Sequence, residues 1–303
     1  MSNRKVHLRF PTLPSSLASY PRVVLTRRPG LLEATDPTEF EARVDRVRID
    51  ASRVAAYAAV CGFDPARVRQ EGFVPVTYPH VLAMPLHLKI MANERFSLRP
   101  MGLIHLSNTI AVPGELRTGQ VLDLVVTARN YRKTDAGLVF DMNTEISAKG
   151  QPVWRETCVF MSRWPDSAQR TGTRPPRPPK APKDASVLAE LDVRLGTAWG
   201  YARVSNDFNP IHLNDRAARF FGLRGAISHG MWSLARSLAA APGPAPGRDA
   251  RLETQFLTPV QLPARVTVKE WTAENASKRA MCDVRTGRLH MVAHWAAASV
   301  SEQ

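Results

Sequence analysis

Two long stretches of the chain alternate apolar and polar residues with the period of two that is typical of β-strands. The first, residues 104–163, contains such runs at 121–127 and 153–160, and residues 133–137 between them have the composition of a turn. Alternation of this kind is typical of antiparallel strands with one face on a core and the other in water. We therefore expect an antiparallel meander in this part of the chain.

The second stretch, residues 251–300, repeats this scheme. Apolar and polar residues alternate at 251–257, 264–271, 278–284 and 289–295, with a turn at 286–287. In both stretches the leading strand runs up to a proline, Pro113 in the first and Pro259 in the second. The shared spacing predicts a second meander of the same design.

A helical stretch precedes each meander. Residues 229–240 are rich in helix-forming residues, and the Pro- and Gly-rich segment 242–247 that follows cannot continue a helix. In the first half the matching stretch is 80–92, with a proline at position 85. Each half thus contains a leading strand, a short helical insertion, one longer helix and several antiparallel strands. This order predicts an α+β double hot-dog fold, in which each repeat wraps a long helix in an antiparallel sheet, and favours it over two unrelated α+β domains.

A proline-rich segment interrupts the repeat. Residues 164–184 hold six prolines and almost no apolar residue, so they can neither pair in a sheet nor continue a helix. We predict four segments on this basis: a basic N-terminal arm at 1–35, a first hot-dog domain at 36–163, a linker rich in Pro, Arg and Lys at 164–186, and a second hot-dog domain at 187–303.

Composition narrows the class of protein. Of the 303 residues 44% are hydrophobic, which suffices for a buried core. No run approaches the roughly 18 consecutive apolar residues of a membrane-spanning helix, and the N-terminus lacks the apolar segment of a secretory signal. The three cysteines, Cys61, Cys158 and Cys282, are too far apart for a disulfide framework or a zinc motif. We expect a cytoplasmic protein that does not insert into a membrane.

The net charge of +14 raises the question of nucleic-acid binding. Most of the excess lies in residues 1–35 and 163–183, each with six Lys or Arg and one acidic residue. Neither stretch interleaves aromatic residues for base stacking, and no zinc-finger spacing accompanies them. We therefore expect no nucleic-acid partner. These stretches could be solvated tails, or some of their charge could attract a phosphorylated ligand.

Chemistry concentrates in one short segment of the second half. Asp207 and His212 lie five positions apart, with Asn209 and Pro210 between them. Pro210 disfavours helical geometry at the preceding residue, so we expect a turn-rich loop that brings the two side chains together. A carboxylate beside an imidazole can move protons near neutral pH. Taken alone, however, the pair is better explained by chance spacing and an aspartate that caps a turn.

A second segment adds a possible oxyanion donor. Gly230 follows shortly after His212, at the start of the predicted helix. An N–H group at a helix N-terminus has no acceptor within the helix and lies at the positive end of the helix dipole. Such a donor can hold a carbonyl oxygen that becomes negative during a reaction.

Together the two segments resemble a known family. The pattern Tyr-Ala-x-x-Ser-x-Asp-x-Asn-Pro-Ile-His at 201–212, followed by Ile-Ser-His-Gly-Met at 227–231, resembles the MaoC-like, R-specific enoyl-CoA hydratases and dehydratases. The resemblance extends from about residue 190 to the C-terminus. Residues 76–87 and 11–15 are similar, more weakly, to the leading half of double hot-dog members.

The resemblance implies roles for individual residues. Asp207 and His212 would act together on the catalytic water, and the Gly230 amide would bind the thioester oxygen. Asn209 would help to organise the site. Ser205 and His229, which belong to the same motifs, would do the same. The family chemistry requires neither a metal nor a redox cofactor.

The first half departs from this pattern. In its matching segment, residues 57–65, Phe63 stands where Asp207 stands in the second half, and Asp64 is one place late. No histidine follows at the matching distance. We therefore expect the first half to be non-catalytic and to form a wall for the acyl chain. His80, His87 and His105 are expected to be ordinary buried or surface histidines, since no Cys or carboxylate spacing completes a metal site.

The function that follows is hydration of trans-2-enoyl thioesters to (R)-3-hydroxyacyl thioesters, or the reverse dehydration, on coenzyme A or an acyl carrier protein. Two alternatives remain at the level of the sequence, a hot-dog acyl thioesterase and a non-catalytic acyl-thioester-binding protein. The sequence also leaves a homodimer open.

Overall fold

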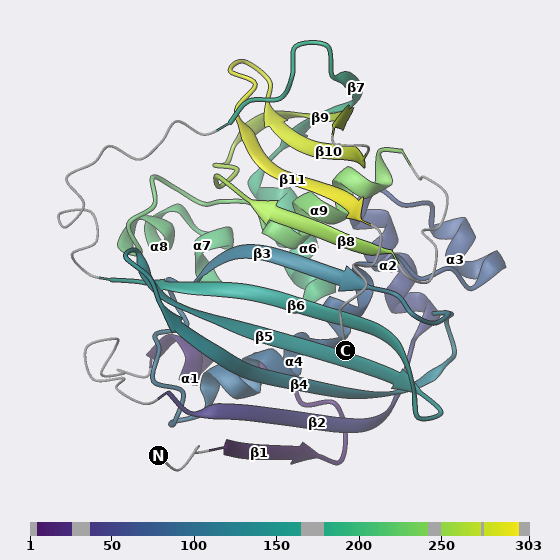
Figure 1. Ribbon diagram of the computed structural model, residues 1–303, viewed down its shortest axis with the longest axis vertical. Coiled ribbons are helices and arrows are strands. Elements are labelled where there is room, and N and C mark those ends of the chain that lie inside the picture. Colours follow the sequence, from purple (N-terminus) through teal and green to yellow (C-terminus); the bar gives the residue numbers. More distant parts are fainter. Residues whose placement is uncertain (1–4, 26–36, 165–178, 242–249, 274–275, 297–303) are drawn as a thin grey trace.

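The computed structural model describes residues 5–25, 37–164, 179–241, 250–273 and 276–296. Its strands form one 11-stranded sheet in the order β1-β2-β4-β5-β6-β3-β8-β11-β10-β9-β7. Figure 1 shows this sheet curving around a layer of helices, with β1 and β2 at one end and β7 and β9 at the other. The first six strands in this order come from the first half of the chain, and the other five from the second half.

The helices and strands have the following bounds. The first half contains β1 (Lys5–Phe10), the 3-10 helix η1 (Leu17–Ser19), α1 (Tyr20–Leu25), β2 (Glu39–Arg48), α2 (Ala51–Cys61), α3 (Pro65–Glu71), α4 (Tyr78–Ala92), β3 (Ile104–Ala111), β4 (Val121–Lys133), β5 (Gly137–Ala148) and β6 (Gln151–Arg163). The second half contains β7 (Ser186–Val193), α6 (Leu195–Ser205), α7 (Pro210–Leu213), α8 (Asp215–Phe220), α9 (Gly230–Ala239), β8 (Arg251–Phe256), β9 (Ala264–Ala273), β10 (Ala276–Asp283) and β11 (Leu289–Ala296).

The two halves meet where β3 pairs with β8. The pairing is antiparallel and runs from Ser107 opposite Gln255 to Ala111 opposite Arg251. Main-chain hydrogen bonds therefore continue the sheet of one half into that of the other. Ile110 is fully buried at this junction, on the face that the helices cover.

The two long helices, α4 and α9, lie against the inner face of the sheet (Figure 1). α4 is apolar around most of its circumference and most of its residues are buried, which is typical of a helix enclosed on all sides. α9 buries Met231, Trp232, Leu234 and Ala235. The predicted helices at 80–92 and 229–240 are thus confirmed, within two residues at each end.

The local design repeats between the halves. α2 and α6 lie side by side, and their tyrosines Tyr57 and Tyr201 contact each other with ring centroids 6.1 Å apart. Each helix ends at a residue in the left-handed conformation, Gly62 at φ 83° and Asn206 at φ 59°. The predicted strands of both meanders and the turn at 133–137 are also present. The expected α+β double hot-dog architecture is therefore confirmed.

The N-terminal segment is not only a solvated arm. β1 is an edge strand that pairs in parallel with β2, from Lys5 opposite Glu39 to Phe10 opposite Val44. Alternate residues of β1 are partly buried, which explains why this segment forms a strand despite its charge. Most of the predicted linker, residues 165–178, lies outside the described residues. Among the described residues, no helix has the length and apolarity needed to cross a membrane.

The junction of the halves makes a prediction about stability. We expect Ile110→Ala to lower the free energy of unfolding by about 2–5 kcal/mol, because it leaves a cavity where the two half-sheets meet. Val187→Ala on the edge strand β7, where the side chain is 56% exposed, should cost less than about 1 kcal/mol. Chemical denaturation measures both. Equal losses would show that this junction is not part of the cooperative core.

Candidate active site

Asp207 lies in the loop that follows α6. The left-handed residue Asn206 ends the helix and turns the chain. The backbone N–H of Asp207 donates to Ser205 Oγ at 3.1 Å, and the Asp207 carboxylate accepts from the backbone N–H of Asn209 at 3.2 Å. The Asp207 side chain is 24% exposed. The Ser205 side chain therefore holds the backbone of this loop at Asp207.

His212 is held by a short helix and not by an irregular loop, which corrects one prediction. Pro210 is the first residue of α7, and the Asn209 side chain caps this helix by accepting from the Ile211 N–H at 3.3 Å. The fixed φ of proline suits the first position of a helix, where no N–H is needed. Proline disfavours helical geometry at the residue before it, and Asn209 accordingly has an extended ψ of 121°. Asn209 thus organises the site by starting the turn that carries His212.

The tautomer of His212 follows from its backbone contact. His212 Nδ1 lies 2.8 Å from the carbonyl oxygen of Ile227, so Nδ1 carries a hydrogen and donates it. In the neutral ring Nε2 then carries a lone pair. The sequence motif at 227–231 therefore contributes a backbone acceptor to the site in addition to His229 and Gly230.

His229 joins Asp207 to His212. Its ring stacks on that of His212 with centroids 3.8 Å apart and an interplanar angle of 27°. Its Nε2 donates to the backbone carbonyl of Asp207 at 3.0 Å and lies 3.9 Å from the carboxylate Oδ2. One carboxylate oxygen of Asp207 and one ring nitrogen each of His212 and His229 lie within 4.8 Å of one another. The structure thus brings the predicted pair and a third predicted residue to one point.

Burial and neighbouring groups set the charges of this cluster. Burial lowers the pKa of His229 to about 3, and the adjacent His212 adds to the effect. Burial also lowers the pKa of His212, despite the opposing effect of Asp207. For Asp207 burial acts upward, but His229, His212 and the Asn209 N–H outweigh it and hold the pKa below its ordinary value. At neutral pH the site therefore contains one carboxylate and two neutral imidazoles.

Gly230 is the first residue of the ten-residue helix α9 and directly follows His229. Its N–H has no acceptor within the helix, and the helix dipole favours negative charge at this end. A Cβ at this position would meet the ring of Phe256 at 3.1 Å, closer than ordinary contact. Phe256 belongs to β8, so the sheet packs closely against the start of α9 and leaves no room for a side chain.

The first half faces this site with a buried polar network. His80 of α4 lies 2.9 Å from both carboxylate oxygens of Glu156, and Asn108 donates to Glu156 Oε1 at 2.6 Å. Burial acts to lower the pKa of His80, but Glu156 outweighs it and raises that pKa, with a smaller contribution from Asp207. Burial acts to raise the pKa of Glu156, but His80 and Asn108 outweigh it and lower that pKa to about 2.

This network contains contacts that the expectation for the histidines of the first half did not include. His80 is buried, as expected for an ordinary core residue, but Glu156 and Cys158 have ligand-type atoms within 4.8 Å of it and of each other. His80 lies more than 70 positions before the other two residues, and Glu156 and Cys158 occupy alternate positions of one strand. No spacing in the sequence therefore indicated that the three residues lie together. Glu156 already has hydrogen bonds from His80 and Asn108, which accounts for its burial without a metal ion.

In the first half, the residues that match the catalytic segment have structural roles. The ring of Phe63 packs against Phe73 with centroids 6.1 Å apart. The Asp64 side chain caps α3 by accepting from the Ala66 N–H at 2.8 Å. These contacts agree with the interpretation that the segment matching residues 201–212 carries no acid–base pair in this half.

One residue beside Asp207 was missed by the sequence analysis. The hydroxyl of Tyr20, in α1, lies 3.3 Å from Asp207 Oδ1. Tyr20 belongs to the segment predicted to be a basic arm, 187 positions away from Asp207. No pattern in the sequence connects the two residues.

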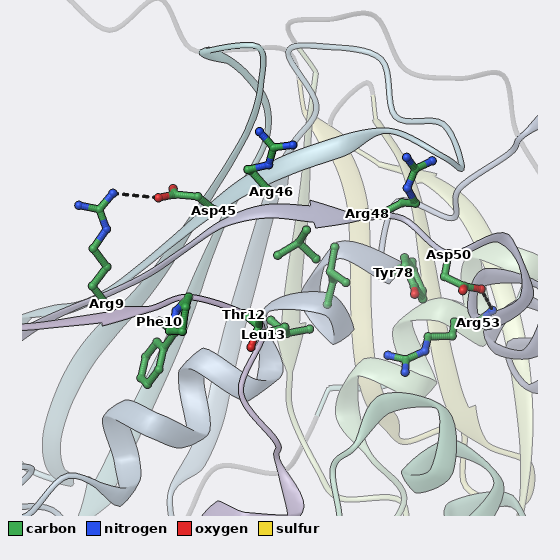
Figure 2. Close-up of a pocket in the computed structure, with 13 residues that line it drawn as sticks. Arg9, Phe10, Thr12, Leu13, Asp45, Arg46, Arg48, Asp50, Arg53 and Tyr78 are labelled. Atoms are coloured by element: carbon green, nitrogen blue, oxygen red, sulfur yellow. Dashed lines mark hydrogen bonds and ion pairs between the residues drawn. The ribbon is translucent and has the colours of Figure 1, made fainter.

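A separate pocket of about 910 Å³ lies near the edge strand β1 and its neighbour β2 (Figure 2). Tyr78 and Leu82 of α4 line it, whereas His80, two positions from Tyr78, turns to the opposite side of the helix to reach Glu156. None of the residues of the Asp207 cluster line this pocket, so we do not place the reaction here. Its rim carries Arg9, Arg46, Arg48 and Arg53.

Comparison with known proteins agrees with this arrangement. The model of the MaoC like domain family matches residues 170–293. A protein of Mycobacterium tuberculosis named 3-hydroxyacyl-thioester dehydratase X is 32% identical over 255 residues, which span 84% of this chain and 88% of that protein. The chain belongs to the MaoC-like dehydratase family. The resemblance found in the motifs at 201–212 and 227–231 is thereby confirmed.

Solved structures of this family superpose over most of the chain. Two crystal structures of HtdX from Mycobacterium tuberculosis match with TM-scores of 0.71 and 0.72 and identities of 28% and 29%, covering 85% and 84% of this chain and 99% of each relative. A further protein of that organism, described as a double hot-dog fold, matches with a TM-score of 0.52 at 11% identity and covers 84% of this chain and 95% of that one. This last similarity concerns the fold alone.

The buried imidazoles of the site region predict a dependence of stability on pH. The His105 ring stacks on Phe160 and meets Phe256 at a tilt, and burial lowers the pKa of His105 to about 3. The unfolded chain takes up a proton on this ring near pH 6.5, the folded protein only near pH 3, so the stability falls as the pH drops between these values.

We expect His105→Phe to reduce this fall, because phenylalanine suits the stacked position and takes up no proton. Urea unfolding from pH 8 to pH 5 measures the effect, which amounts to at most about 1.4 kcal/mol per pH unit for one imidazole. Above pH 7.5 the unfolding free energies of the wild type and of His105→Phe, plotted against pH, should run parallel. A variant curve as steep as that of the wild type below pH 6 would contradict the assignment of a neutral buried His105.

Proposed function

We propose that this dehydratase adds water to trans-2-enoyl thioesters to form (R)-3-hydroxyacyl thioesters, and catalyses the reverse elimination. The observation that carries the proposal is the cluster of Asp207, His212 and His229 directly before the first residue of α9. This places a carboxylate, an imidazole lone pair and an unpaired backbone N–H in one region. Family membership gives the reaction class, a hydro-lyase acting on acyl thioesters.

Asp207 and His212 hold and activate the water. The carboxylate accepts one hydrogen bond from the water, and the Nε2 lone pair of His212 accepts the other. As the hydroxyl adds to the β-carbon, the pair takes up the remaining proton of the water. The same proton then passes to the α-carbon, which completes the addition of one H₂O and restores the resting charges. No electrons are gained or lost, so the reaction needs no redox cofactor.

Gly230 binds the thioester carbonyl oxygen through its N–H. Negative charge grows on this oxygen as enolate character develops, so the hydrogen bond is stronger in the transition state than in the substrate. The dipole of α9 acts in the same direction. The ring of Phe256 lies where a Cβ of residue 230 would point, which favours glycine at this position.

The remaining predicted residues support these groups. Asn209 caps α7, Ser205 holds the Asp207 backbone, and His229 stacks on His212 and donates to the Asp207 carbonyl. The first half forms a wall for the acyl chain.

The thioester is carried by coenzyme A or by an acyl carrier protein, and an assay on both carriers decides between them. The three cysteines are all free and buried, which supports a cytoplasmic setting.

The catalytic pair gives the main test. Asp207→Asn and His212→Ala should each lower kcat/KM for hydration of crotonyl-CoA by roughly 10² to 10⁴, the usual contribution of a general acid–base group. Asp64→Asn is the matched control in the first half, and its activity should equal that of the wild type. Near wild-type activity of both catalytic variants would refute the assignment.

The same assay separates the alternative functions. A thioesterase would release free thiol, which a colorimetric thiol reagent detects, whereas a hydratase leaves the thioester intact. A non-catalytic acyl-binding protein would bind the substrate without turnover. The acid–base pair favours the hydratase over both.

The close contact at Gly230 makes a further prediction. Gly230→Ala retains the N–H but forces the new methyl group against Phe256, which displaces the start of α9. We expect kcat to fall by roughly tenfold or more, up to the roughly 10² to 10³ that complete loss of an oxyanion donor costs. Phe256→Ala combined with Gly230→Ala should recover part of the loss, because it removes the clash. If the double variant were no better than Gly230→Ala, steric displacement would not be the cause.

A further inference from the structure

The N-terminal segment is firmly attached to the body of the protein. β1 pairs with β2, and Lys5 Nζ lies 2.9 Å from the Glu41 carboxylate. Further along, Ser16, Ser19 and Val23 are buried, and α1 contacts α4. Tyr20, the first residue of α1, is thus held between two anchored stretches, and its side chain has a fixed place.

The hydroxyl of Tyr20 makes three contacts, all with the loop that carries Asp207. It accepts from the backbone N–H of Phe208 at 2.7 Å. It lies 3.0 Å from the carbonyl oxygen of Asn206 and 3.3 Å from Asp207 Oδ1. The Tyr20 ring also meets that of Phe208 edge to face, with centroids 6.2 Å apart. One side chain from the start of the chain therefore contacts three successive residues of the catalytic loop.

The hydroxyl has one hydrogen for two acceptors. When Asp207 is ionised, donation to its carboxylate is a charge-assisted hydrogen bond and is the stronger choice. When Asp207 takes up a proton, the hydrogen can turn to the Asn206 carbonyl, which remains an acceptor. Burial, and next the charge of Asp207, raise the pKa of Tyr20 far above its ordinary value, so the hydroxyl keeps this hydrogen over the working pH range.

We propose that Tyr20 is a positioning residue of the active site, whose hydroxyl orients the Asp207 carboxylate and stabilises its ionised form. The inference rests on the function proposed above for Asp207. It assigns to the N-terminal segment, predicted to be a basic arm, a direct part in completing the site of the second half.

Tyr20→Phe tests this proposal with little risk to the fold, because it keeps the ring and its contact with Phe208. We expect kcat for crotonyl-CoA hydration to fall about tenfold and KM to change less than about twofold, since a hydrogen bond to a charged group is lost. The acidic limb of the kcat/KM profile should move to higher pH by roughly one unit, because a hydrogen bond to the ionised carboxylate lowers its pKa. Tyr131→Phe, in β4, is the matched control and should leave both quantities unchanged.

A double-mutant cycle shows whether Tyr20 acts through Asp207. In the Asp207→Asn background, Tyr20→Phe should change the residual rate less than about twofold, because the charge that it stabilises is already absent. An equal tenfold loss in both backgrounds would overturn the proposal and leave Tyr20 with a purely structural role.

A spectroscopic titration separates this inference from the proposed reaction. The pKa of Asp207, followed by ¹³C NMR of labelled aspartate side chains and assigned with Asp207→Asn, should rise in Tyr20→Phe. If the wild type shows no hydratase activity but this pKa rises, the positioning role stands and the reaction is wrong. If the wild type is active but neither the pKa nor the pH profile moves, the reaction stands and the role of Tyr20 is refuted.

Discussion

The structure depends on the antiparallel pairing of β3 with β8. This single set of main-chain hydrogen bonds turns two half-sheets into one and fixes the two long helices on the same face. It also brings α4 of the first half near the loop that carries Asp207, where the charge of His80 helps to lower the pKa of the Asp207 carboxyl group.

The two halves solve the same physical problem in different ways. Each buries a carboxylate, which is costly unless hydrogen bonds and opposite charge compensate for the lost water. In the first half the Glu156 side chain is fully buried and accepts hydrogen bonds from His80 and Asn108. In the second half Asp207 is partly exposed and faces two neutral imidazoles, so it retains capacity to accept a hydrogen bond from a ligand. The two carboxylates therefore differ in their access to a ligand.

Much of the fold could be read from the sequence because its signals are local. Alternation at 121–127 and the helix formers at 229–240 depend on neighbours within a few residues, and both elements are present. The motif around Asp207 is also local, and it located the cluster. Contacts across the fold could not be read in this way. Tyr20 reaches Asp207, and His80 reaches Glu156, only because the sheet brings distant segments together. The conformation around Pro210 could not be predicted for a different reason. Proline disfavours helical geometry at the residue before it, but it also suits the first position of a helix, and Pro210 begins the helix that holds His212.

The most direct test of the account follows the oxygen atom of the water. A crotonyl thioester is incubated with the protein in H₂¹⁸O, and the products are separated by chiral chromatography and analysed by mass spectrometry. We expect an intact (R)-3-hydroxybutanoyl thioester with ¹⁸O on carbon 3. Release of free thiol with ¹⁸O in the carboxyl group of the acid, or no incorporation at all, would contradict it.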